Sequence, residues 1–346
     1  MVRVGIIGAG TIARFRHIPE LSSNPDAEIT SYLTHSNPEK LQQLTETYGG
    51  KVYTDLAEFI AGGIDAAVVC NPNAKHAEVA LELMRHGIHV LCEKPMATTI
   101  EDCEKMVACA KENNVKFMVA QNQRFLAPHV KARELIASGA IGKVLSFDTV
   151  YAHAGPENWS KNPNPWFFDK KTSVFGAFAD LGIHKTDLIH YLIDDTIVEV
   201  GCILSTVDKK YPDGTMINVD DNAFCIYRTE SGIGGTLHVS WTQYAEEINT
   251  VTVQGTEGCV HCFRDPEYSC VLQRRDGTEE KFAFEDDESN EAVTSGRGTN
   301  SGVSEEFIRS ILEDREPLSS GEENLRSMKV VFAAQKSAQE GRIVHV

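Results

Sequence analysis

Two side chains that can exchange protons near neutral pH lie four residues apart in the middle of the chain. They are Asp180 and His184, which stand ahead of an apolar run that is typical of a helix. Positions four apart share one helical face, so the carboxylate and the imidazole would point into the same space. An unperturbed histidine has a pKa of about 6.5, so its ring can take a proton from a hydroxyl group and return it. The spacing therefore indicates acid/base chemistry, although a polar pair that only braces a helix would have the same spacing.

A lysine at the end of an apolar strand could assist the same chemistry. The strand pattern His89–Cys92 leads directly into Glu93-Lys94-Pro95, and proline restricts the backbone of the residue before it. An ammonium group there could hydrogen-bond a substrate hydroxyl and lower the pKa of that hydroxyl. The commoner alternative is a solvated lysine at a strand end.

A glycine-rich turn near the N-terminus predicts a nucleotide beside these groups. The apolar pattern of residues 2–7 is typical of a strand buried on both faces of a parallel sheet. It runs into Gly8-Ala-Gly10-Thr-Ile-Ala13, where the first glycine permits a tight turn, the second admits a pyrophosphate, and the alanine lets a helix pack on the strand. We therefore predict a dinucleotide site at Gly8, Gly10, Thr11 and Ile12.

The ribose end of this predicted site lacks the usual acidic residue. NAD enzymes place Asp or Glu after the second strand, here Glu28–Leu33, and this chain has Thr34-His35-Ser36-Asn37 at that point. The same stretch has no arginine that could bind the 2′-phosphate of NADP. His35 and Ser36 are the residues available there, and we expect NAD as the cofactor, with NADP possible.

The order of the remaining patterns predicts two kinds of sheet. Strands and helices alternate through the first third of the chain, as in a doubly wound parallel sheet, and ligands bind at the carboxyl edge of such sheets. Beyond residue 197, short strand patterns recur between turns such as Asp213-Gly214 and Asp276-Gly277, which predicts a large, mostly antiparallel sheet. One face of that sheet should pack on helices, and the other, if apolar, on a second subunit.

The loop of residues 154–174 combines aromatic side chains with prolines. Its two tryptophans are Trp159 and Trp166, and sugars stack their C–H faces on such rings. This composition suits the wall of a sugar pocket, although a hydrophobic plug under a long loop explains Trp159 equally well.

Composition narrows the class of protein. The 346 residues favour two domains, 42% of them are hydrophobic, and the formal net charge is −17. That charge would repel phosphate groups, so we expect no nucleic acid or membrane partner and favour a small neutral molecule. No apolar run reaches 18 residues and no leader pattern stands at the start, so we expect a cytoplasmic protein. Nine cysteines indicate reduced thiols, and Cys259-Val-His-Cys262 has no second ligand pair, so we expect no metal site.

Together these stretches resemble the Gfo/Idh/MocA family of nicotinamide-dependent sugar and polyol oxidoreductases. The matching motifs occur in order: the glycine turn, Asn71-Pro-Asn-x-x-His76, Glu93-Lys94-Pro95, and Gly-x-x-x-Asp180-x-Gly-x-His184-x-x-Asp187. The resemblance implies an α/β protein with a Rossmann domain, a doubly wound parallel sheet, over residues 1–122. Residues 123–346 would form an α+β domain with a large, mostly antiparallel open sheet for substrate binding and oligomerisation.

The resemblance also implies roles for single residues. His184 would be the general base, Asp180 its orienting partner, and Lys94 the group that polarises the hydroxyl. Substrate contacts would come from these three residues together with Arg124 and Trp166. Cofactor contacts outside the glycine turn would come from His35, Ser36, Asn71, Pro72, Asn73, His76, Glu93, Lys94 and Asn122.

The implied reaction is the oxidation of a secondary hydroxyl of a sugar, glycoside or cyclitol, with hydride passed to a nicotinamide. The enzyme would be a homo-oligomer, a dimer or tetramer, formed through the C-terminal sheet. Family members often have Trp-Arg where this chain has Trp166-Phe167, so a cation is missing and a phosphorylated substrate is disfavoured. Two alternatives remain: an NAD-retaining enzyme that cleaves glycosides through a redox cycle, and a non-catalytic nucleotide-binding regulator.

Overall fold

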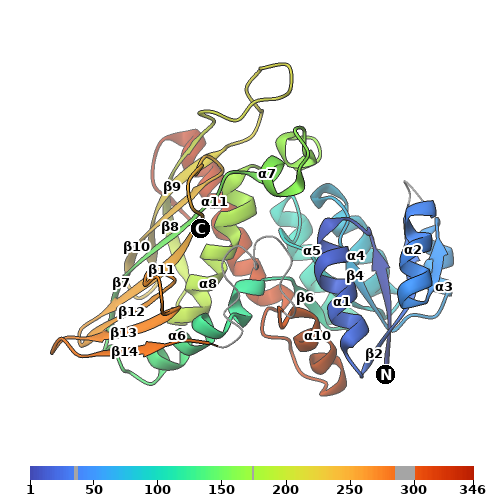
Figure 1. Ribbon diagram of the computed structural model, residues 1–346, viewed down its shortest axis with the longest axis horizontal. Helices are drawn as coiled ribbons and strands as arrows, with labels where there is room; N and C mark the ends of the chain where they lie inside the picture. The colour runs from blue at the N-terminus through green and yellow to red at the C-terminus, as the bar shows by residue number, and fades with distance from the viewer. Residues whose placement is uncertain (35–37, 174, 285–300) are drawn as a thin grey trace. The chain divides into compact units, whose positions relative to one another are not determined.

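The computed structural model describes residues 1–34, 38–173, 175–284 and 301–346, and it contains two compact units (Figure 1). The first unit is Met1–Gln121 with Ala292–Leu325, and the second is Asn122–Glu291 with Arg326–Val346. The predicted domains, residues 1–122 and 123–346, did not include this return of the chain to the first unit.

Hydrogen bonds hold the returning segment to the first unit. The Ser319 carbonyl accepts the Val119 amide at 2.9 Å, and the Ser319 hydroxyl donates to the Val119 carbonyl at 2.7 Å. The Ser301 amide donates to the carboxylate of Glu20, which is buried, at 2.7 Å. Strand and helix patterns did not reveal these contacts, because the partners lie 200 and 281 residues apart along the chain.

The sheet of the first unit has six parallel strands in the order β3-β2-β1-β4-β5-β6. The order reverses between β1 and β4, which is the switch point where doubly wound sheets bind ligands. Every residue of β4 is buried, as expected for a strand in a parallel sheet covered on both faces. The predicted doubly wound sheet is confirmed. Its strands are β1 (Val2–Ile7), β2 (Ala27–Leu33), β3 (Lys51–Tyr53), β4 (Ala66–Val69), β5 (His89–Cys92) and β6 (Phe117–Val119).

Short polar caps start two of the helices in this unit. The Asp55 carboxylate accepts the Glu58 amide at 3.0 Å, and the Thr99 hydroxyl accepts the Asp102 amide at 3.1 Å. Such caps satisfy amides that have no partner inside the helix. The helical segments of the unit are η1 (Ala13–His17), α1 (Ile18–Ser23), α2 (Pro38–Tyr48), α3 (Leu56–Ala61), η2 (Asn73–Lys75), α4 (His76–Arg85), α5 (Ile100–Glu112) and α10 (Val303–Leu312).

The sheet of the second unit has nine strands in the order β14-β13-β12-β11-β7-β10-β9-β8-β15. Its neighbouring strands pair antiparallel, apart from β7 and β10, which are parallel. The predicted large, mostly antiparallel sheet is confirmed. Its strands are β7 (Val144–Ala152), β8 (Ile197–Ser205), β9 (Asn222–Thr229), β10 (Gly234–Ser240), β11 (Ile248–Gly255), β12 (Gly258–Cys262), β13 (Cys270–Arg274), β14 (Glu279–Phe282) and β15 (Val344–His345).

Helices cover one face of this sheet. Figure 1 shows α6 and α8 against it. Strand β9 alternates accordingly, since Cys225 and Tyr227 are buried while Phe224 and Ile226 are exposed. The helical segments are η3 (Asn122–Phe125), α6 (Ala127–Ala137), α7 (Pro156–Ser160), η4 (Trp166–Phe168), η5 (Phe178–Gly182), α8 (Ile183–Ile193) and α11 (Gly321–Glu340), the last of which spans both units.

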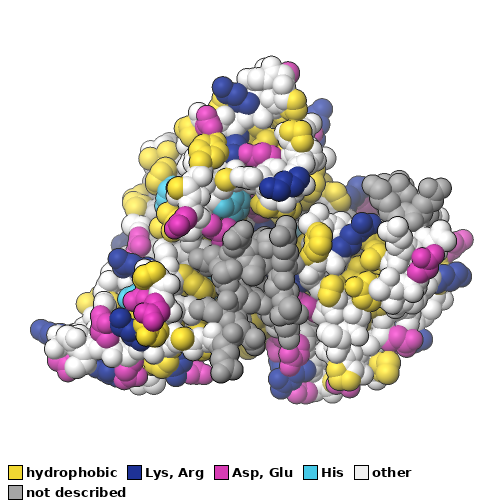
Figure 2. Space-filling model, viewed as in Figure 1, with side chains coloured by type: hydrophobic (Ala, Val, Ile, Leu, Met, Phe, Trp, Pro, Cys, Tyr) yellow, Lys and Arg dark blue, Asp and Glu magenta, His cyan; other side chains and the backbone are white. Residues whose placement is uncertain are grey.

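Charges of both signs are mixed on the visible surface. Figure 2 shows Lys and Arg side chains interspersed with Asp and Glu on the face in view. None of the helices within the described ranges is long and apolar enough to cross a membrane. Over the same ranges, His, Cys, Asp and Glu side chains form no group of three or more that could hold a metal ion.

Helix α8 is buried almost all round, so its polar residues need partners inside the protein. Nε2 of His190 accepts the Ile197 amide at 3.1 Å, and Nδ1 of the same ring lies 3.0 Å from the Ser327 hydroxyl. The Thr186 hydroxyl lies 3.1 Å from the Tyr227 hydroxyl. These contacts fix the rotation of α8 about its axis, and with it the direction in which His184 points.

Lys185 is the unusual residue of this helix, because it is fully buried. Its Nζ lies 5.7 Å from the centre of the Tyr151 ring and has no hydrogen-bond partner among the described residues. Burial lowers the pKa of Lys185 to about 7, against the charges of Cys262 and Glu247, which raise it. In an unfolded chain the pKa of a lysine is about 10.4.

We expect the folded protein to gain stability relative to Lys185→Met as the pH rises from about 7 to about 10. In this range the unfolded chain keeps the lysine proton and the native state does not, so the free energy of unfolding increases by up to about 1.4 kcal/mol per pH unit. Urea denaturation of both proteins at pH 6, 7, 8 and 9 measures the difference. Parallel curves over this range would contradict the depressed pKa.

Candidate functional site

The predicted site residues are divided between the two units. The glycine turn, the motif that begins at Asn71, and Lys94 belong to the first unit, while Asp180, His184, Arg124 and Trp166 belong to the second. Each unit therefore contains a chemically distinct part of the predicted site.

The glycine turn has a closed side and an open side. Gly8 has φ +81, and a Cβ there would lie 2.8 Å from the Cys70 carbonyl oxygen and 2.9 Å from the Asn71 nitrogen. Gly8 therefore needs to be glycine both for its backbone angle and for its contact with the chain after β4. A Cβ at Gly10 would meet no atom of the described residues within 4 Å, so this position is open to a ligand. Ala13 is fully buried, as the packing of a helix on β1 requires.

The motif after β4 contributes a polar atom of Asn71 that can bind a ligand and a histidine, His76, that connects two loops. Oδ1 of Asn71 is buried and has no hydrogen-bond partner among the described residues, so it suits a ligand that donates a hydrogen bond. The ring of His76 lies between two loops, with Nδ1 2.9 Å from the Pro95 carbonyl and Nε2 2.8 Å from the Asn71 carbonyl. Burial lowers the pKa of His76, while both carbonyls raise it. His76, predicted to touch the cofactor, ties the loops after β4 and β5 together.

Glu93 is also engaged within the protein. One carboxylate oxygen lies 2.8 Å from Nε2 of His17, and the other accepts the Lys94 amide at 3.1 Å. Burial raises the pKa of Glu93, but His17, Arg16 and Lys94 outweigh it and lower this pKa to about 2. Glu93 is therefore an anion that fixes the start of the loop carrying Lys94, which is itself partly exposed and is joined to Pro95 by a cis peptide bond.

These features fit a dinucleotide. The space over Gly10 admits a pyrophosphate, and the Asn71 oxygen at the neighbouring strand end offers an acceptor to the same ligand. Thr11 and Ile12 follow the open glycine at the start of the first helical segment, and Asn73 is buried beside the exposed Pro72. His35 and Ser36, predicted at the ribose, lie outside the described residues.

Asp180 and His184 lie on a helix that begins with a wide turn. The sequence indicated a regular helix, whereas Phe178–Gly182 is π-helical and α8 continues from Ile183. Such turns are rare and are frequent at functional sites. Oδ2 of Asp180 accepts a hydrogen bond from Nε1 of Trp241 at 3.2 Å. The His184 ring is mostly buried, and its centre lies 6.4 Å from that of Tyr151.

An aromatic surface, made of Trp159, Trp166 and Phe167, adjoins this turn. The Trp166 and Phe167 rings stack with centres 4.0 Å apart, and Trp159 meets Phe167 edge-on at 5.7 Å. Each tryptophan is 37% exposed, so both offer free ring area to a ligand. Phe167 also meets Trp241 edge-on at 6.5 Å, which links the aromatic surface to the tryptophan that holds Asp180.

Arg124 has a partner that the sequence analysis did not consider. Its Nε and Nη2 donate to the two carboxylate oxygens of Asp187 at 2.6 and 2.9 Å, and both side chains are buried. In this structure Arg124 therefore connects η3 to α8, and its predicted contact with substrate stays a prediction. Asn122, predicted to bind the cofactor, is buried at the start of η3.

Trp241 and Tyr151 contact the candidate residues Asp180 and His184, and sequence reasoning did not single them out. Both lie on or next to strands whose pattern indicated only a sheet, and their contacts with Asp180 and His184 join residues more than 30 positions apart. A tryptophan directly after a strand end was the available signal for Trp241, and it is weak.

We expect Gly10→Asp to weaken NAD binding by roughly a hundredfold or more, about 2.7 kcal/mol, without loss of the fold. A Cβ at this position has open space around it among the described residues, but the longer aspartate side chain would occupy the space of the pyrophosphate and add a negative charge. Titration calorimetry measures the affinity. Gly234→Asp, which adds the same charge at an exposed strand glycine of the second unit that has no positive φ, is the control and should bind NAD normally. If Gly10→Asp binds NAD with the wild-type affinity, the assignment of the nucleotide site to this turn is wrong.

Comparison with known proteins matches both units. Residues 2–121 match an oxidoreductase family with an NAD-binding Rossmann fold, and residues 129–261 match the GFO/IDH/MocA C-terminal domain.

Individual relatives cover most of the chain. The 1,5-anhydro-D-fructose reductase of Ensifer adhaerens is 30% identical over 259 residues, which cover 75% of this chain and 74% of that protein. The myo-inositol 2-dehydrogenase of Thermotoga maritima is 27% identical over 353 residues, which cover 99% and 98%. The crystal structure of the WlbA dehydrogenase from Bordetella pertussis, in complex with NADH and UDP-GlcNAcA, superposes with a TM-score of 0.82 at 25% identity and covers 100% of this chain and 97% of that one.

The glycine turn is open where a pyrophosphate approaches, and both halves of the chain match the two domains of one family. The protein therefore belongs to the GFO/IDH/MocA family of oxidoreductases with an NAD-binding Rossmann fold.

Proposed function

We propose that the protein is a dehydrogenase that oxidises a secondary hydroxyl of a neutral sugar, glycoside or cyclitol, with NAD as hydride acceptor. The observation that carries this proposal is the aromatic surface of Trp159, Trp166 and Phe167, which is linked through Trp241 to the Asp180 carboxylate. Exposed rings beside a hydrogen-bonding carboxylate offer a polyhydroxylated molecule both of its usual contacts, C–H stacking and hydroxyl recognition.

Oxidation of an alcohol removes a hydride and a proton from one carbinol group. Bound NAD supplies the nicotinamide that takes the hydride. We assign the proton to the His184 imidazole, and to the Asp180 carboxylate the orientation of that ring and a hydrogen bond to a substrate hydroxyl. Lys94 follows the anchored Glu93, and we assign to its ammonium group the polarisation of the reacting oxygen.

The names of the relatives support a polyhydroxylated substrate. One is a reductase of 1,5-anhydro-D-fructose and another a dehydrogenase of myo-inositol, an anhydro sugar and a cyclitol. The lean towards NAD over NADP rests on Thr34, an uncharged residue at the end of β2, and on Arg14, whose Nε donates to the Ala9 carbonyl at 2.9 Å. A 2′-phosphate needs a cation at this end of the sheet.

The direct test is incubation with NAD or NADP and a panel of polyols, sugars and glycosides, followed by nicotinamide absorbance. We expect NADH to accumulate with at least one neutral polyol or sugar. If the protein retains its NAD and cleaves glycosides without net formation of NADH, it is instead an enzyme that cleaves glycosides through a redox cycle. Absence of any turnover despite tight NAD binding would instead favour a nucleotide-binding regulator.

We expect His184→Ala to lower kcat by roughly a hundredfold to ten-thousandfold, the usual contribution of a positioned general base. NAD affinity should stay near the wild-type value, because the glycine turn lies in the other unit. Steady-state kinetics and calorimetry measure the two quantities, and the exposed His86, changed to Ala, is the control. Full activity in His184→Ala, with turnover lost only in Lys94→Met, would make the lysine the base.

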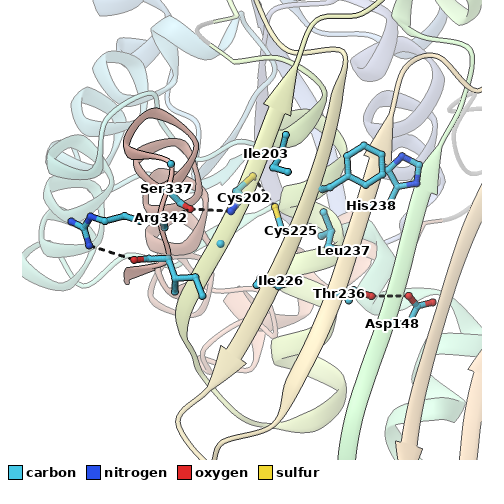
Figure 3. Close-up of a pocket in the computed structure, with 14 residues that line it drawn as sticks. Asp148, Cys202, Ile203, Cys225, Ile226, Thr236, Leu237, His238, Ser337 and Arg342 are labelled. Carbon is cyan, nitrogen blue, oxygen red and sulfur yellow. Dashed lines mark hydrogen bonds between the residues drawn. The ribbon is translucent and has the colours of Figure 1, made fainter.

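We also propose that two copies of the chain associate through the open face of the second sheet. Large apolar side chains project from that face: Ile203 is 67% exposed, Phe224 50%, Ile226 54% and Ile343 53%. They line a hollow of about 600 Å³ (Figure 3), together with residues such as Thr236, which donates to Asp148 at 2.8 Å.

Charge favours a second copy as the occupant of this face. Two chains of formal charge −17 repel one another, so they should meet where charge is balanced. Arg228 Nε on β9 donates to Glu199 on β8 at 2.7 Å, and Arg342, in the turn before β15, pairs with Glu340 at the end of α11. Identical apolar faces also form a self-complementary interface about a two-fold axis.

We expect Phe224→Glu to shift the protein from dimer or tetramer towards monomer, because it places a charge in the centre of the apolar face. Analytical ultracentrifugation of the full chain measures the assembly state. Leu312→Glu, at an equally exposed leucine of the first unit, should leave assembly unchanged. A wild-type monomer at micromolar concentration would refute the interface.

A further inference from the structure

Asp220 holds three successive amides at the start of the catalytic segment, Gly176–His184. Its Oδ2 accepts the Phe178 amide at 2.7 Å, and its Oδ1 accepts the Gly176 amide at 3.2 Å. Its backbone carbonyl accepts the Ala177 amide at 2.8 Å. A single residue, more than 40 positions away in sequence, therefore binds the three backbone amides that lead into the π-helical turn.

These contacts give hydrogen-bond acceptors to the first amides of the turn. Amides at the start of a helical segment have no acceptor inside the segment, and a carboxylate there satisfies them and interacts favourably with the helix dipole. The contact is also close, since a Cβ on Gly176 would lie 2.0 Å from the Asp220 carbonyl oxygen. Only glycine permits this approach, which gives a reason for the first residue of the Gly-x-x-x-Asp motif.

Trp241 supplies a second point of attachment. Its indole donates to Asp180 at 3.2 Å, and its backbone amide donates at 2.8 Å to the carbonyl of Asp221, the residue after Asp220. Trp241 is fully buried. The segment that carries Asp180 is thus held at its first amides by Asp220 and at its carboxylate by Trp241, and these two residues are themselves joined through Asp221.

The ionisation of Asp220 suits this task. Burial raises the pKa of its carboxyl to about 6, against the amides of Phe178 and Gly176, which lower it. Asp221 raises this pKa further through its charge, whereas the nearby Cys225 thiol, whose own pKa is raised well above its usual value, is neutral at neutral pH. At neutral pH the group is a carboxylate and can accept at both oxygens, whereas the protonated acid loses one acceptor.

We propose that Asp220 is a positioning residue, which sets Asp180 and His184 for proton transfer by holding the amides of Gly176, Ala177 and Phe178. The proposal rests on the function proposed above. Nothing in the sequence near Asp220 marks it, because its role exists only through contacts with a distant segment.

The test compares Asp220→Asn with the wild type in two measurements. The amide side chain can accept at only one oxygen and presents an N–H to a backbone N–H, so amide hydrogen exchange in residues 176–182 should become faster. The kcat on the best substrate of the panel should fall roughly tenfold to a hundredfold, the cost of a small misplacement of reacting groups. Binding of NAD, which uses the other unit, should not change.

Asp265→Asn is the matched control. Asp265 also accepts two backbone amides, those of Glu267 and Tyr268 at 2.9 and 3.0 Å, but in the loop between β12 and β13. This variant should keep the wild-type kcat and the wild-type exchange in residues 176–182. If Asp220→Asn does not fold, Gly176→Ala takes its place, since the added Cβ forces the segment away from Asp220 and predicts the same two changes.

The outcomes separate the two proposals. Faster exchange with reduced kcat supports a positioning role. Unchanged exchange, or faster exchange with wild-type kcat, overturns it. If the wild type oxidises no member of the panel, the proposed function fails, and the exchange measurement alone then decides whether Asp220 holds the segment.

Discussion

The ion pair between Arg124 and Asp187 is the interaction on which the second unit depends. Two parallel hydrogen bonds of 2.6 and 2.9 Å join the side chains, which are 3% and 1% exposed. Removing one partner of such a pair leaves a buried charge and typically costs about 3–5 kcal/mol. The pair joins η3, the first element of the unit, to α8, the helix that carries His184. The same ion pair therefore fixes the first segment of the second unit and the helix that carries the proposed base.

Much of the fold was predictable because its signals are local. The apolar run of β1 and the glycines after it require only neighbouring residues, and the turn at Gly8 shows the positive φ that its residue type allows. The contacts of Asp220, Trp241 and Lys185 were not predictable, because each arises where segments distant in sequence meet. The π-helical turn was not predictable for the same reason, since the amides at its start are bound by the distant Asp220.

Several residues of the sequence motifs hold loops in place through hydrogen bonds within the protein. His76 joins two loops through their carbonyls, and Glu93 pairs with His17. In a sequence, a polar side chain that binds a ligand looks the same as one that orients the loop around the ligand. Both kinds of residue are expected at the carboxyl edge of a parallel sheet, where loops without regular structure must still be held rigidly. The chemistry assigned to Lys94 depends on this scaffold as much as on its own ammonium group.

The return of the chain to the first unit has a consequence for protein synthesis. Ser319 pairs with Val119 at the edge of β6, Lys116 Nζ lies 2.9 Å from the Asp314 carboxylate, and Ser301 binds Glu20. During translation the first unit leaves the ribosome early, yet these partners emerge only after almost the whole second unit has been made. The nascent Rossmann sheet must therefore persist with one edge incomplete while the second unit folds, and its final stability is reached near the end of the chain.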